Sequence, residues 1–432
     1  MKSDLLFTEN FKSTPYWWDE SPRLRSKTEA FPHDCEVLVI GSGYTGLHAA
    51  IQTARAGKKT VIIDSYDAGF GCSTRNGGQI STSIKPSFRA LSNKFGKQRA
   101  KAIHEEGITA LKWIEKFVTK EGIDCSFKVV GRFHGAHTPK KYADLLKEIK
   151  NQPKGLERRI KLITKEQQYS ELGTDAYYGG IVFEDHASID PGKYHNGLLQ
   201  IAKELGVTIT ENCRADSIEN SGQFIVTTQK GKIKTNSVIV ATNGYSGNLI
   251  PWLKRRIIPV GSYVIATEPL PKDLIDKLMP RDRILSDTRK VVYYYRPSPD
   301  RTRILFGGRV TSGETGIKTA ARLLHKDLCS LFPELNSKKI SHAWMGFVGY
   351  TFDSLAHCGE YKGIHFSGGY CGSGVSMASY LGMRIGRKII GDPEGFSVLS
   401  SIPFPTRIYY QGNPWFLSTA VTGYRLLDQL RI

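Results

Sequence analysis

The sequence offers little support for a disulfide-bonded or membrane-spanning protein. Its 432 residues include seven cysteines, an odd number without a CxxC pair, so we expect no disulfide framework. No stretch approaches the roughly 20 apolar residues of a transmembrane helix. Residues 1–22 carry charges throughout and lack the apolar core of a secretory signal. We therefore expect a cytoplasmic protein without a transmembrane segment.

Metal-binding patterns are also missing. The eleven histidines show no metal-ligand spacing. His134 and His137 are the closest pair, and we interpret them as residues of a surface loop. We predict no metal site.

Basic residues are abundant, with a formal net charge of +19, but they do not form one block. They are scattered, for example over residues 140–150, 158–165 and 254–256. A nucleic-acid-binding protein is one interpretation of this charge. We favour a solvated, lysine-rich surface and expect no nucleic-acid partner. Attraction of anionic substrates is a secondary explanation.

Residues 37–64 have the pattern of a βαβ unit. A short apolar run at 37–40 ends in a glycine turn and predicts a buried parallel strand. Residues 45–56 are small and compatible with a helix, and Gly57 stands where a helix C-cap is expected. A second apolar run at 60–63 ends at Asp64.

The glycine turn has GxGxxG spacing. Gly41 would make the tight turn, Gly43 would let the backbone approach a pyrophosphate, and Gly46 would let helix and strand pack closely. The helix N-terminus would point free N–H groups at the phosphates. Asp64, about 20 residues further on, is placed to accept hydrogen bonds from a ribose. The predicted dinucleotide contacts are Gly41, Ser42, Gly43, Tyr44, Thr45, Gly46 and Asp64.

A second glycine-rich stretch, residues 69–78, follows the ribose acid. Its glycines would let the backbone approach a large planar ligand, and its hydroxyl and guanidinium groups could donate to phosphates or ring oxygens. A flexible surface loop is the alternative, but such a loop has no need of an Arg-Asn pair inside the glycines. The stretch favours FAD over NAD. The contacts it adds are Ser73, Thr74, Arg75, Asn76, Gly77 and Gly78.

The remaining pattern predicts an α/β fold, α+β overall. Helices are expected at 102–118, 194–205 and 375–390, and strands at 207–210, 224–227, 237–241 and 363–369, with residues 238–241 buried. Aromatic-rich strands at 263–267, 291–295 and 304–306, broken by turns at Pro297, Pro299 and Asp300, predict a different sheet.

We predict two domains with extensions at both ends. A Rossmann-like FAD-binding domain is discontinuous, over residues 33–90, 181–250 and 345–395. An antiparallel-sheet substrate domain with a helical cap takes residues 91–180 and 251–344. Residues 1–32 are expected to form an irregular N-terminal arm and residues 396–432 a C-terminal extension.

These motifs resemble the D-amino-acid oxidase superfamily of FAD oxidoreductases, most closely its gamma-glutamylputrescine oxidoreductase type. Further similar stretches are residues 16–19, 240–244, 293–309, 366–375 and 403–428, so the resemblance covers essentially the whole chain. It adds FAD contacts at Ala215, Ala241, Thr242, Gly369, Gly372, Gly374 and Val375.

The resemblance also bears on flavin attachment. Some members attach the flavin covalently through cysteine or histidine. The cysteine attachment position falls on Val348 here, so we predict non-covalent FAD. The usual Ser and His of the C-terminal motif are replaced by Cys371 and Ser373. Cys371 is either a reactive thiol near the flavin or, as we favour, a small residue filling a tight turn.

The resemblance implies oxidation of an amine C–N bond by hydride transfer to flavin N5. The resulting imine would hydrolyse to an aldehyde or oxo acid, and O2 or another acceptor would take the electrons. Because the cofactor supplies the chemistry, we assign no catalytic acid–base residue. The substrate amine has to be neutral, and burial lowers an amine pKa.

The substrate-binding candidates are Tyr263, Tyr294, Arg296 and Trp344. Arg296 could pair with a carboxylate such as a gamma-glutamyl end, and the aromatic residues could wall the flavin. Tyr294 and Arg296 should point the same way, because a strand alternates its faces. Ordinary core packing is the alternative for each residue.

Three functions are compatible with the sequence. The first is a gamma-glutamylputrescine-like amine oxidoreductase of polyamine catabolism. The second is an amino-acid or N-methyl-amine oxidase or dehydrogenase of the same superfamily. The third, from a different class, is a flavin-containing RNA-associated protein.

Overall fold

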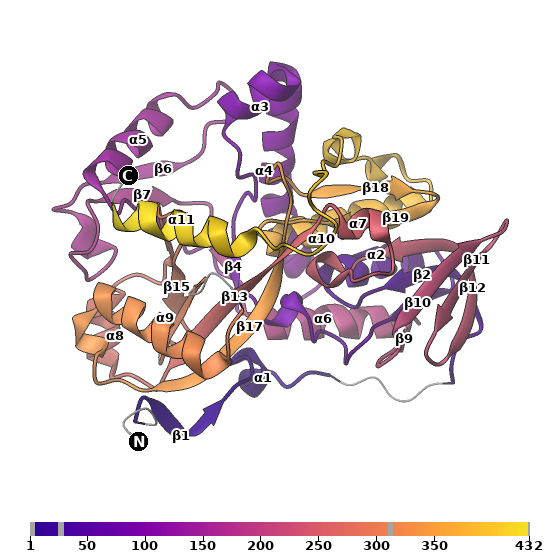
Figure 1. Cartoon of the computed structure of the whole chain (residues 1–432), viewed down its shortest axis with the longest axis horizontal. Coiled ribbons are helices and arrows are strands. Elements are labelled where there is room, and N and C mark those ends of the chain that lie inside the picture. The colour runs from indigo at the N-terminus through magenta and orange to yellow at the C-terminus, as the bar shows by residue number, and fades with distance from the viewer. Residues whose placement is uncertain (1–4, 25–29, 310–313, 431–432) are drawn as a thin grey trace.

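The computed structural model describes residues 5–24, 30–309 and 314–430. Within these residues the strands form two large sheets, with helices packed around them (Figure 1). The chain passes between the sheets several times. The mixed α/β fold predicted from the sequence is confirmed.

The first sheet, of eight strands, has a parallel core. Strand β2 (Asp34–Ile40) lies between β3 (Thr60–Ile63) and β12 (Gly231–Val240), and the parallel order extends to β9 (Thr208–Thr210) and β19 (Ile364–Gly368). Residues of β2 and β3 are buried on both faces, which explains their unbroken apolar runs. The sheet is completed by β10 (Ala215–Asn220), β11 (Phe224–Thr228) and β18 (His357–Tyr361).

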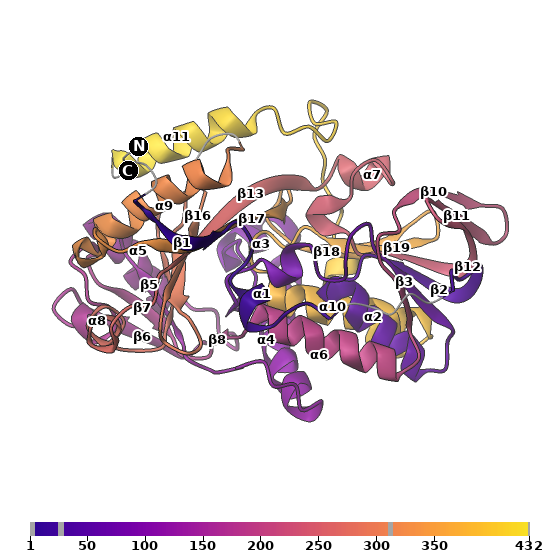
Figure 2. The same cartoon turned by 90° about the horizontal axis from the view of Figure 1, so that it is seen from below.

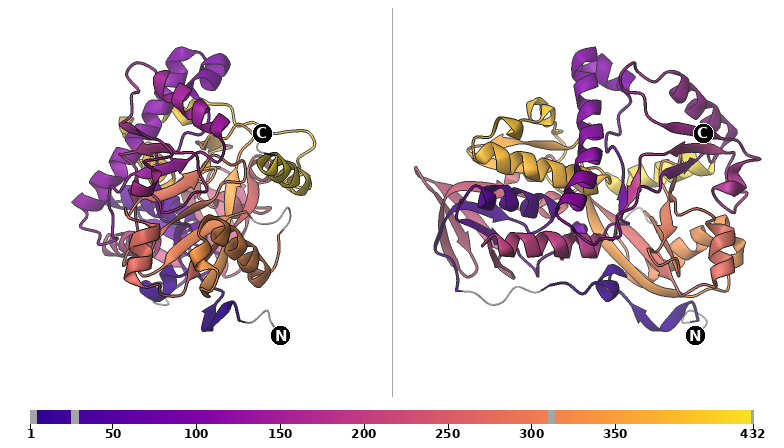
Figure 3. Two further views of the ribbon diagram at one scale, coloured as in Figure 1. Left: turned by 90° about the vertical axis from the view of Figure 1, so that its left-hand side faces the viewer. Right: turned by 180° about the vertical axis from the view of Figure 1, so that it is seen from behind.

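Helices cover this sheet closely. Helices α2 (Tyr44–Arg55), α6 (Pro191–Glu204) and α10 (Gly374–Ile389) lie side by side in Figures 1 and 2. Glycines bring α10 to backbone contact with α2, since a Cβ on Gly382 would lie 2.3 Å from the Thr45 carbonyl oxygen. Helices α3 (Phe88–Phe95) and α4 (Lys97–Lys120) pack next to α10, as the view from behind shows (Figure 3).

The second sheet has nine strands, most of them antiparallel. Their order is β1 (Phe7–Lys12), β17 (Ile340–Tyr350), β13 (Ile258–Thr267), β16 (Ile304–Gly308), β15 (Tyr294–Pro297), β14 (Ile284–Asp287), β5 (Arg132–Gly135), β7 (Gly180–Phe183) and β6 (Ile160–Ile163). One face packs on α8 (Lys272–Leu278) and α9 (Ile317–Leu331). The other face carries Val264, Leu305 and Trp344, which pack against the N-terminal arm.

The remaining elements are small. Strands β4 (Gln79–Ile80) and β8 (Ala187–Ser188) pair between the two sheets, while α5 (Pro139–Lys150) and α7 (Pro251–Lys254) lie on the outside (Figure 1). All seven cysteines are free thiols. Among the helices of the described residues, none is long and apolar enough to cross a membrane.

The N-terminal arm differs from the prediction. Instead of being irregular, it contains β1 and a short helix, α1 (Trp17–Glu20). Strand β1 pairs in parallel with β17 at the edge of the nine-stranded sheet. Only Phe7 of β1 is buried. The segment therefore has no apolar run of the kind from which we predicted the other strands.

Three further expectations are corrected by the strand pairing. Strand β15 begins three residues after the predicted start and includes Pro297, which we had expected in a turn. Residues 181–183 and 345–350 pair within the nine-stranded sheet, so the two domain boundaries predicted there shift. His134 lies in β5 and His137 is buried, because adjacent strands cover the segment that we interpreted as a surface loop.

The C-terminal extension ends in helix α11 (Leu417–Gln429), which lies across the outside of the nine-stranded sheet region (Figure 1). Its Asp428 carboxylate accepts hydrogen bonds from the backbone N–H groups of Lys290 and Val291, at 2.7 and 2.9 Å. The extension is therefore attached to the loop that leads into β15.

Candidate active site

The glycine turn after β2 is shaped by backbone contacts that exclude side chains. Gly41 has φ +108°, and a Cβ there would lie 2.9 Å from the Ala241 carbonyl oxygen. A Cβ on Gly46 would lie only 1.9 Å from the Gly41 carbonyl oxygen. The turn thus holds β2, α2 and the end of β12 together at backbone distance, which leaves the α2 N-terminus open in front of it.

Ser73 lies at that N-terminus. Gly43 is the N-cap of α2 and offers no side chain, and the first helical N–H, that of Tyr44, donates to Ser73 Oγ at 3.0 Å. A Cβ on Gly43 would lie 2.9 Å from the same oxygen. Helix N-termini bind phosphate through such N–H groups, so these three residues form a cradle of the kind that a pyrophosphate needs.

Asp64 closes the other side of the turn. Its carboxylate accepts hydrogen bonds from Ser42 N at 2.8 Å, Ser42 Oγ at 2.6 Å and Tyr66 N at 3.1 Å. Burial raises the pKa of Asp64, while these donors act in the opposite direction. The acid is held at the end of β3, beside the glycine turn, as the spacing predicted. Thr45 points elsewhere, with its hydroxyl 2.6 Å from the Tyr370 phenol.

Three indole N–H groups fix the second glycine-rich stretch. Trp17 donates to the Asn76 carbonyl oxygen at 2.9 Å, Trp18 to Thr74 Oγ at 2.8 Å, and Trp344 to the Arg75 carbonyl oxygen at 2.8 Å. Two of them come from the arm and one from β17. The part played by the arm was missed by sequence reasoning, although a run of three aromatic residues in a polar segment is a signal for it.

The Arg75 side chain is enclosed by protein groups. It donates to the carbonyl oxygens of Phe70 at 2.6 Å and Met345 at 3.1 Å. Its guanidinium carbon lies 4.7 Å from the Trp18 ring centroid and 4.4 Å from that of Phe70. Arg23 covers the Trp18 ring as well, at 4.1 Å. The side chain therefore braces the loop, and donation to FAD remains a prediction for its free N–H groups.

Residues 76–78 make a tight turn against β15. The Asn76 side chain accepts from Gly78 N at 2.9 Å and donates to the carbonyl oxygens of Cys72 and Ser73, both at 3.0 Å. A Cβ on Gly77 would lie 3.2 Å from the Tyr294 ring. The loop backbone is thus pressed between the cradle at the α2 N-terminus and the nine-stranded sheet.

The late glycine motif approaches the same region from β19. Gly369 has φ +75°, and its N–H donates to the Asn243 side chain at 2.9 Å, just after Ala241 and Thr242. Gly372 also has a positive φ of +86°, and a Cβ there would lie 3.9 Å from a Val348 methyl group. Gly374 and Val375 begin α10. Ala215 lies apart from this group, at the start of β10.

Cys371 fits the space-filling interpretation. It is 1% exposed and adopts a positive φ of +52° between the two glycines. Its sulfur lies 3.4 Å from Thr351 Oγ, and burial raises the pKa of its thiol. A buried thiol with a raised pKa is protonated at neutral pH and a poor nucleophile.

Comparison with known proteins identifies the cradle. The family model described as FAD dependent oxidoreductase (DAO) matches residues 36–387. The chain belongs to this family. The residues present fit the cofactor, since the cradle is lined by glycines whose positions a Cβ would fill, with an open helix N-terminus and an acid at the end of β3.

Curated relatives match nearly the full chain. A probable oxidoreductase OrdL from Haemophilus influenzae is 30% identical and aligns over 92% of both chains. Gamma-glutamylputrescine oxidoreductase from Escherichia coli is 29% identical over 85% of this chain and 87% of its own. Glycine oxidase from Geobacillus kaustophilus has the same fold, with a TM-score of 0.72 over 87% of this chain and 99% of its own, at 16% identity.

Three of the four substrate candidates, Tyr294, Arg296 and Trp344, lie on the side of the nine-stranded sheet that packs against residues 75–78. Tyr294 contacts Gly77, and the Arg296 guanidinium lies against Gly78, as the alternation of strand faces predicted. The Tyr294 hydroxyl lies 2.9 Å from Ser262 Oγ. Burial raises the pKa of Tyr294 to about 12, so the phenol stays neutral at physiological pH.

Arg296 is occupied by backbone oxygens. It donates to the carbonyls of Gly78 at 3.0 Å, Ile189 at 2.9 Å and Pro297 at 3.1 Å, and it is 5% exposed. These bonds connect the loop 76–78, called the FAD loop below, to the residues just before α6. The geometry supports a positioning role for Arg296 beside the cofactor and gives no support to the predicted pairing with a substrate carboxylate.

The other two candidates are core residues. Trp344 is 1% exposed and packs among Trp17, Val264 and Leu305, beneath the FAD loop. Tyr263 lies on the opposite face of the sheet, in the cluster with α9, and its hydroxyl bonds the backbone of Thr315. The structure does not bring Tyr263 together with the FAD cradle.

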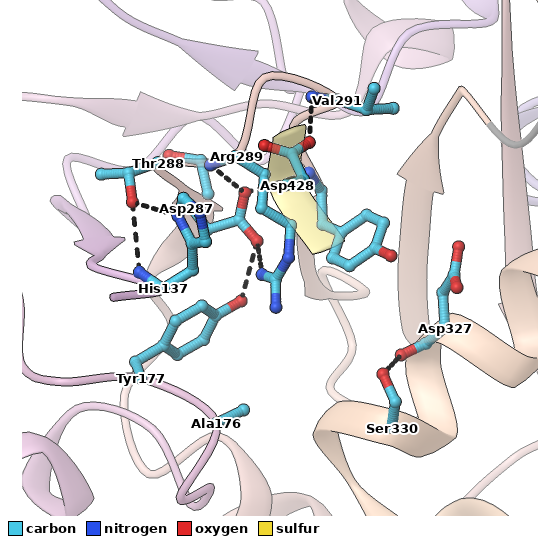
Figure 4. A network of polar contacts seen from close by, with 12 residues as sticks. His137, Ala176, Tyr177, Asp287, Thr288, Arg289, Val291, Asp327, Ser330 and Asp428 are labelled. Carbon is cyan, nitrogen blue, oxygen red and sulfur yellow. Dashed lines mark hydrogen bonds and ion pairs between the residues drawn. The ribbon is translucent and has the colours of Figure 1, made fainter. Parts of the chain in front are cut away.

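A buried polar network fixes the loop before β15 (Figure 4). The Asp287 carboxylate accepts from the Arg289 side chain, from Tyr177 OH at 3.3 Å and from Tyr293 N at 3.3 Å. The Thr288 hydroxyl is hydrogen-bonded to the backbone N–H and the ring Nδ1 of His137. The Asp428 carboxylate of α11 accepts from the backbone N–H groups of Lys290 and Val291. The loop is therefore held rigidly from two sides, which places Tyr294 and Arg296 precisely against the FAD loop.

The arm provides a test of this architecture. We expect Trp17→Ala to destabilise the fold by about 3–5 kcal/mol, as burial of a tryptophan implies, and to lower the FAD content. Trp17 is fully buried and its N–H supports the Asn76 carbonyl. Thermal unfolding and the FAD-to-protein ratio measure both effects. Trp415→Ala is the control, because Trp415 is 65% exposed. Equal behaviour of the two variants would contradict a structural role for the arm.

Proposed function

We propose that this FAD-dependent oxidoreductase oxidises a C–N bond of an amine of the gamma-glutamylputrescine type. The proposal is supported by the alignment with the Escherichia coli gamma-glutamylputrescine oxidoreductase along most of both chains. When bound, FAD supplies the hydride acceptor. The product imine would hydrolyse to an aldehyde in water. Such an activity belongs to polyamine catabolism, which we place in the cytoplasm.

The residues of the chain would prepare the substrate for this step. Tyr294 is only partly exposed and packs against the loop 76–78, beside the cofactor cradle. Burial lowers the pKa of an amine and so favours its neutral form, the form from which hydride can leave. The neutral Tyr294 phenol can hold the substrate through a hydrogen bond without acting as a base at physiological pH.

We propose that FAD is held without a covalent bond. Val348 occupies the position of the family's cysteine attachment and has no nucleophilic atom. Cys371 and Cys72, the cysteines of the two glycine-rich stretches, have thiol pKa values raised by burial, that of Cys72 to about 11. Neither thiol is therefore activated for attack on the flavin ring.

Both proposals can be tested on purified protein. Acid or heat should release free FAD and leave a colourless chain. Flavin that stays on the denatured chain would refute the non-covalent assignment.

The substrate is tested by turnover on a panel of amines. We expect gamma-glutamylputrescine to be oxidised with the highest kcat/KM, followed with both a peroxide readout and an artificial dye acceptor. Glycine, N-methylglycine and D-amino acids represent the second function. Turnover of one of these instead would reassign the substrate. RNA retention on filters with a steep salt dependence, without amine turnover, would favour the RNA-associated alternative.

A further inference from the structure

A polar row crosses the side of the nine-stranded sheet that contacts Gly77 and Gly78, beyond Tyr294. Ser286 of β14 pairs laterally with Tyr294, and its hydroxyl lies 2.9 Å from His134 Nδ1 of β5. Phe133 points to the opposite face, into the core with Tyr177 and Leu285. By strand alternation, Arg132 and His134 share the face that looks toward the FAD loop.

Arg132 has no counterpart for its charge in the described part of the chain. Its Nε atom is buried without a hydrogen-bond partner, and none of the ion pairs among the described residues includes it. Its charged and titratable neighbours are Arg158, His134 and His186. The acid beside this group, Asp185, acts on Arg158 and lies 4.0 Å from His186.

The positive charge of this cluster is carried by its two arginines alone. Burial lowers the pKa of His134 to about 3 and that of His186 well below its usual value, so both imidazoles are neutral. Burial and the nearby Arg158 lower the pKa of Arg132 to about 10, which leaves it protonated at neutral pH. Arg158 is already engaged, donating to Thr82 Oγ at 3.0 Å and lying over the Phe183 ring.

An uncompensated guanidinium in a partly buried position is costly unless an anion completes the site. The planar fork of arginine matches a carboxylate in a bidentate geometry. Arg296, the arginine predicted for this task, already has three of its five N–H groups bonded to backbone carbonyls. Arg132 lies on the same face, and its Nε atom is buried without a hydrogen-bond partner.

We propose that Arg132 binds the carboxylate at the remote end of the substrate. Strands β5 and β15 are separated by β14, so the two strands lie about 10 Å apart, given a spacing of about 4.8 Å between neighbouring strands. His134 stands in the row of Tyr294 and Ser286, and Arg132 lies two residues before it on β5. The site therefore selects amines whose carboxylate is several bonds away from the oxidised carbon. His134 and Ser286 line the path between the two ends. This inference rests on the proposed amine oxidation and deepens it.

The test compares Arg132→Met with Arg132→Lys in the flavin-loaded protein. Glutarate is the probe for the carboxylate site, and its binding is measured by calorimetry and by perturbation of the flavin spectrum. We expect Arg132→Met to weaken glutarate binding tenfold or more and Arg132→Lys to weaken it less. The FAD-to-protein ratio should not change. Lys161→Met, an equal change of charge at an exposed site of the same sheet, should bind glutarate as the parent protein does.

Kinetics supply the second readout. Arg132→Met should raise KM for gamma-glutamylputrescine tenfold or more and leave KM for N-acetylputrescine, which lacks the carboxylate, nearly unchanged. Equal glutarate binding by Arg132→Met and the parent protein, or no binding by the parent protein, would overturn the proposal. Because glutarate binding needs no turnover, these outcomes are separate from failure of the proposed function, which would show as absence of amine oxidation.

Discussion

Gly43→Val is expected to give a protein that folds but purifies without FAD. A Cβ at this position would lie 2.9 Å from Ser73 Oγ, and the two further methyl groups of valine would extend into the space before the α2 N-terminus. The pyrophosphate has to approach that space within hydrogen-bond distance of the backbone N–H groups. Because the pyrophosphate could then neither reach the backbone nor form these hydrogen bonds, FAD binding should be abolished rather than weakened.

The measurement is the FAD-to-protein ratio from the visible and ultraviolet absorbance, with circular dichroism to establish that the fold persists. Gly423→Val is the matched control, since a Cβ at Gly423 in α11 would meet no atom within 4 Å. A Gly43→Val protein with one FAD per chain would show that the cradle is not the pyrophosphate site.

Arg296→Ala should have the second largest effect, on stability and on the cofactor together. Removal of the buried guanidinium leaves the carbonyl oxygen of Ile189 without its Arg296 donor, and that of Gly78 with the backbone N–H of Ile189 alone. We expect a loss of about 3 kcal/mol in the free energy of unfolding, since hydrogen bonds to a charged group contribute about 1.5–3 kcal/mol each. FAD content should fall as the loop 76–78 loosens. Activity per bound FAD should fall equally for acidic and neutral amines.

Urea unfolding, FAD content and kinetics on the two classes of amine measure these effects. Arg214→Ala serves as a control, because Arg214 is an exposed residue paired with Asp216. If Arg296→Ala keeps its stability and FAD but loses affinity for acidic amines alone, Arg296 and not Arg132 is the substrate anchor.

The local patterns predicted the cofactor half of the molecule well. The apolar runs at 37–40 and 60–63 are β2 and β3, and the glycines between them form the cradle. These features depend on short stretches of sequence, where a buried parallel strand and a tight turn leave a clear signature. The separated segments near 208 and 364 joined the same sheet, as their βαβ patterns predicted.

The substrate half was predicted less well because its interactions join distant segments. The alternation in residues 294–296 correctly gave the shared face of Tyr294 and Arg296, yet only the folded chain places Gly78 and Ile189 within reach of Arg296. Arg132 stands in a short strand, Arg132–Gly135, whose neighbours come from β14 and β7. Whether Arg132 has a hydrogen-bond partner depends on which strands lie beside β5, and the sequence around Arg132 does not show this.

The central claim, an FAD enzyme that takes hydride from an amine, is tested most directly by an anaerobic titration. The purified protein should show the visible absorption bands of oxidised flavin. Addition of gamma-glutamylputrescine without oxygen should bleach these bands at a stoichiometry of one substrate per FAD, and readmission of an acceptor should restore them. A protein without flavin absorbance, or a flavin that no amine on the panel bleaches, would contradict the account.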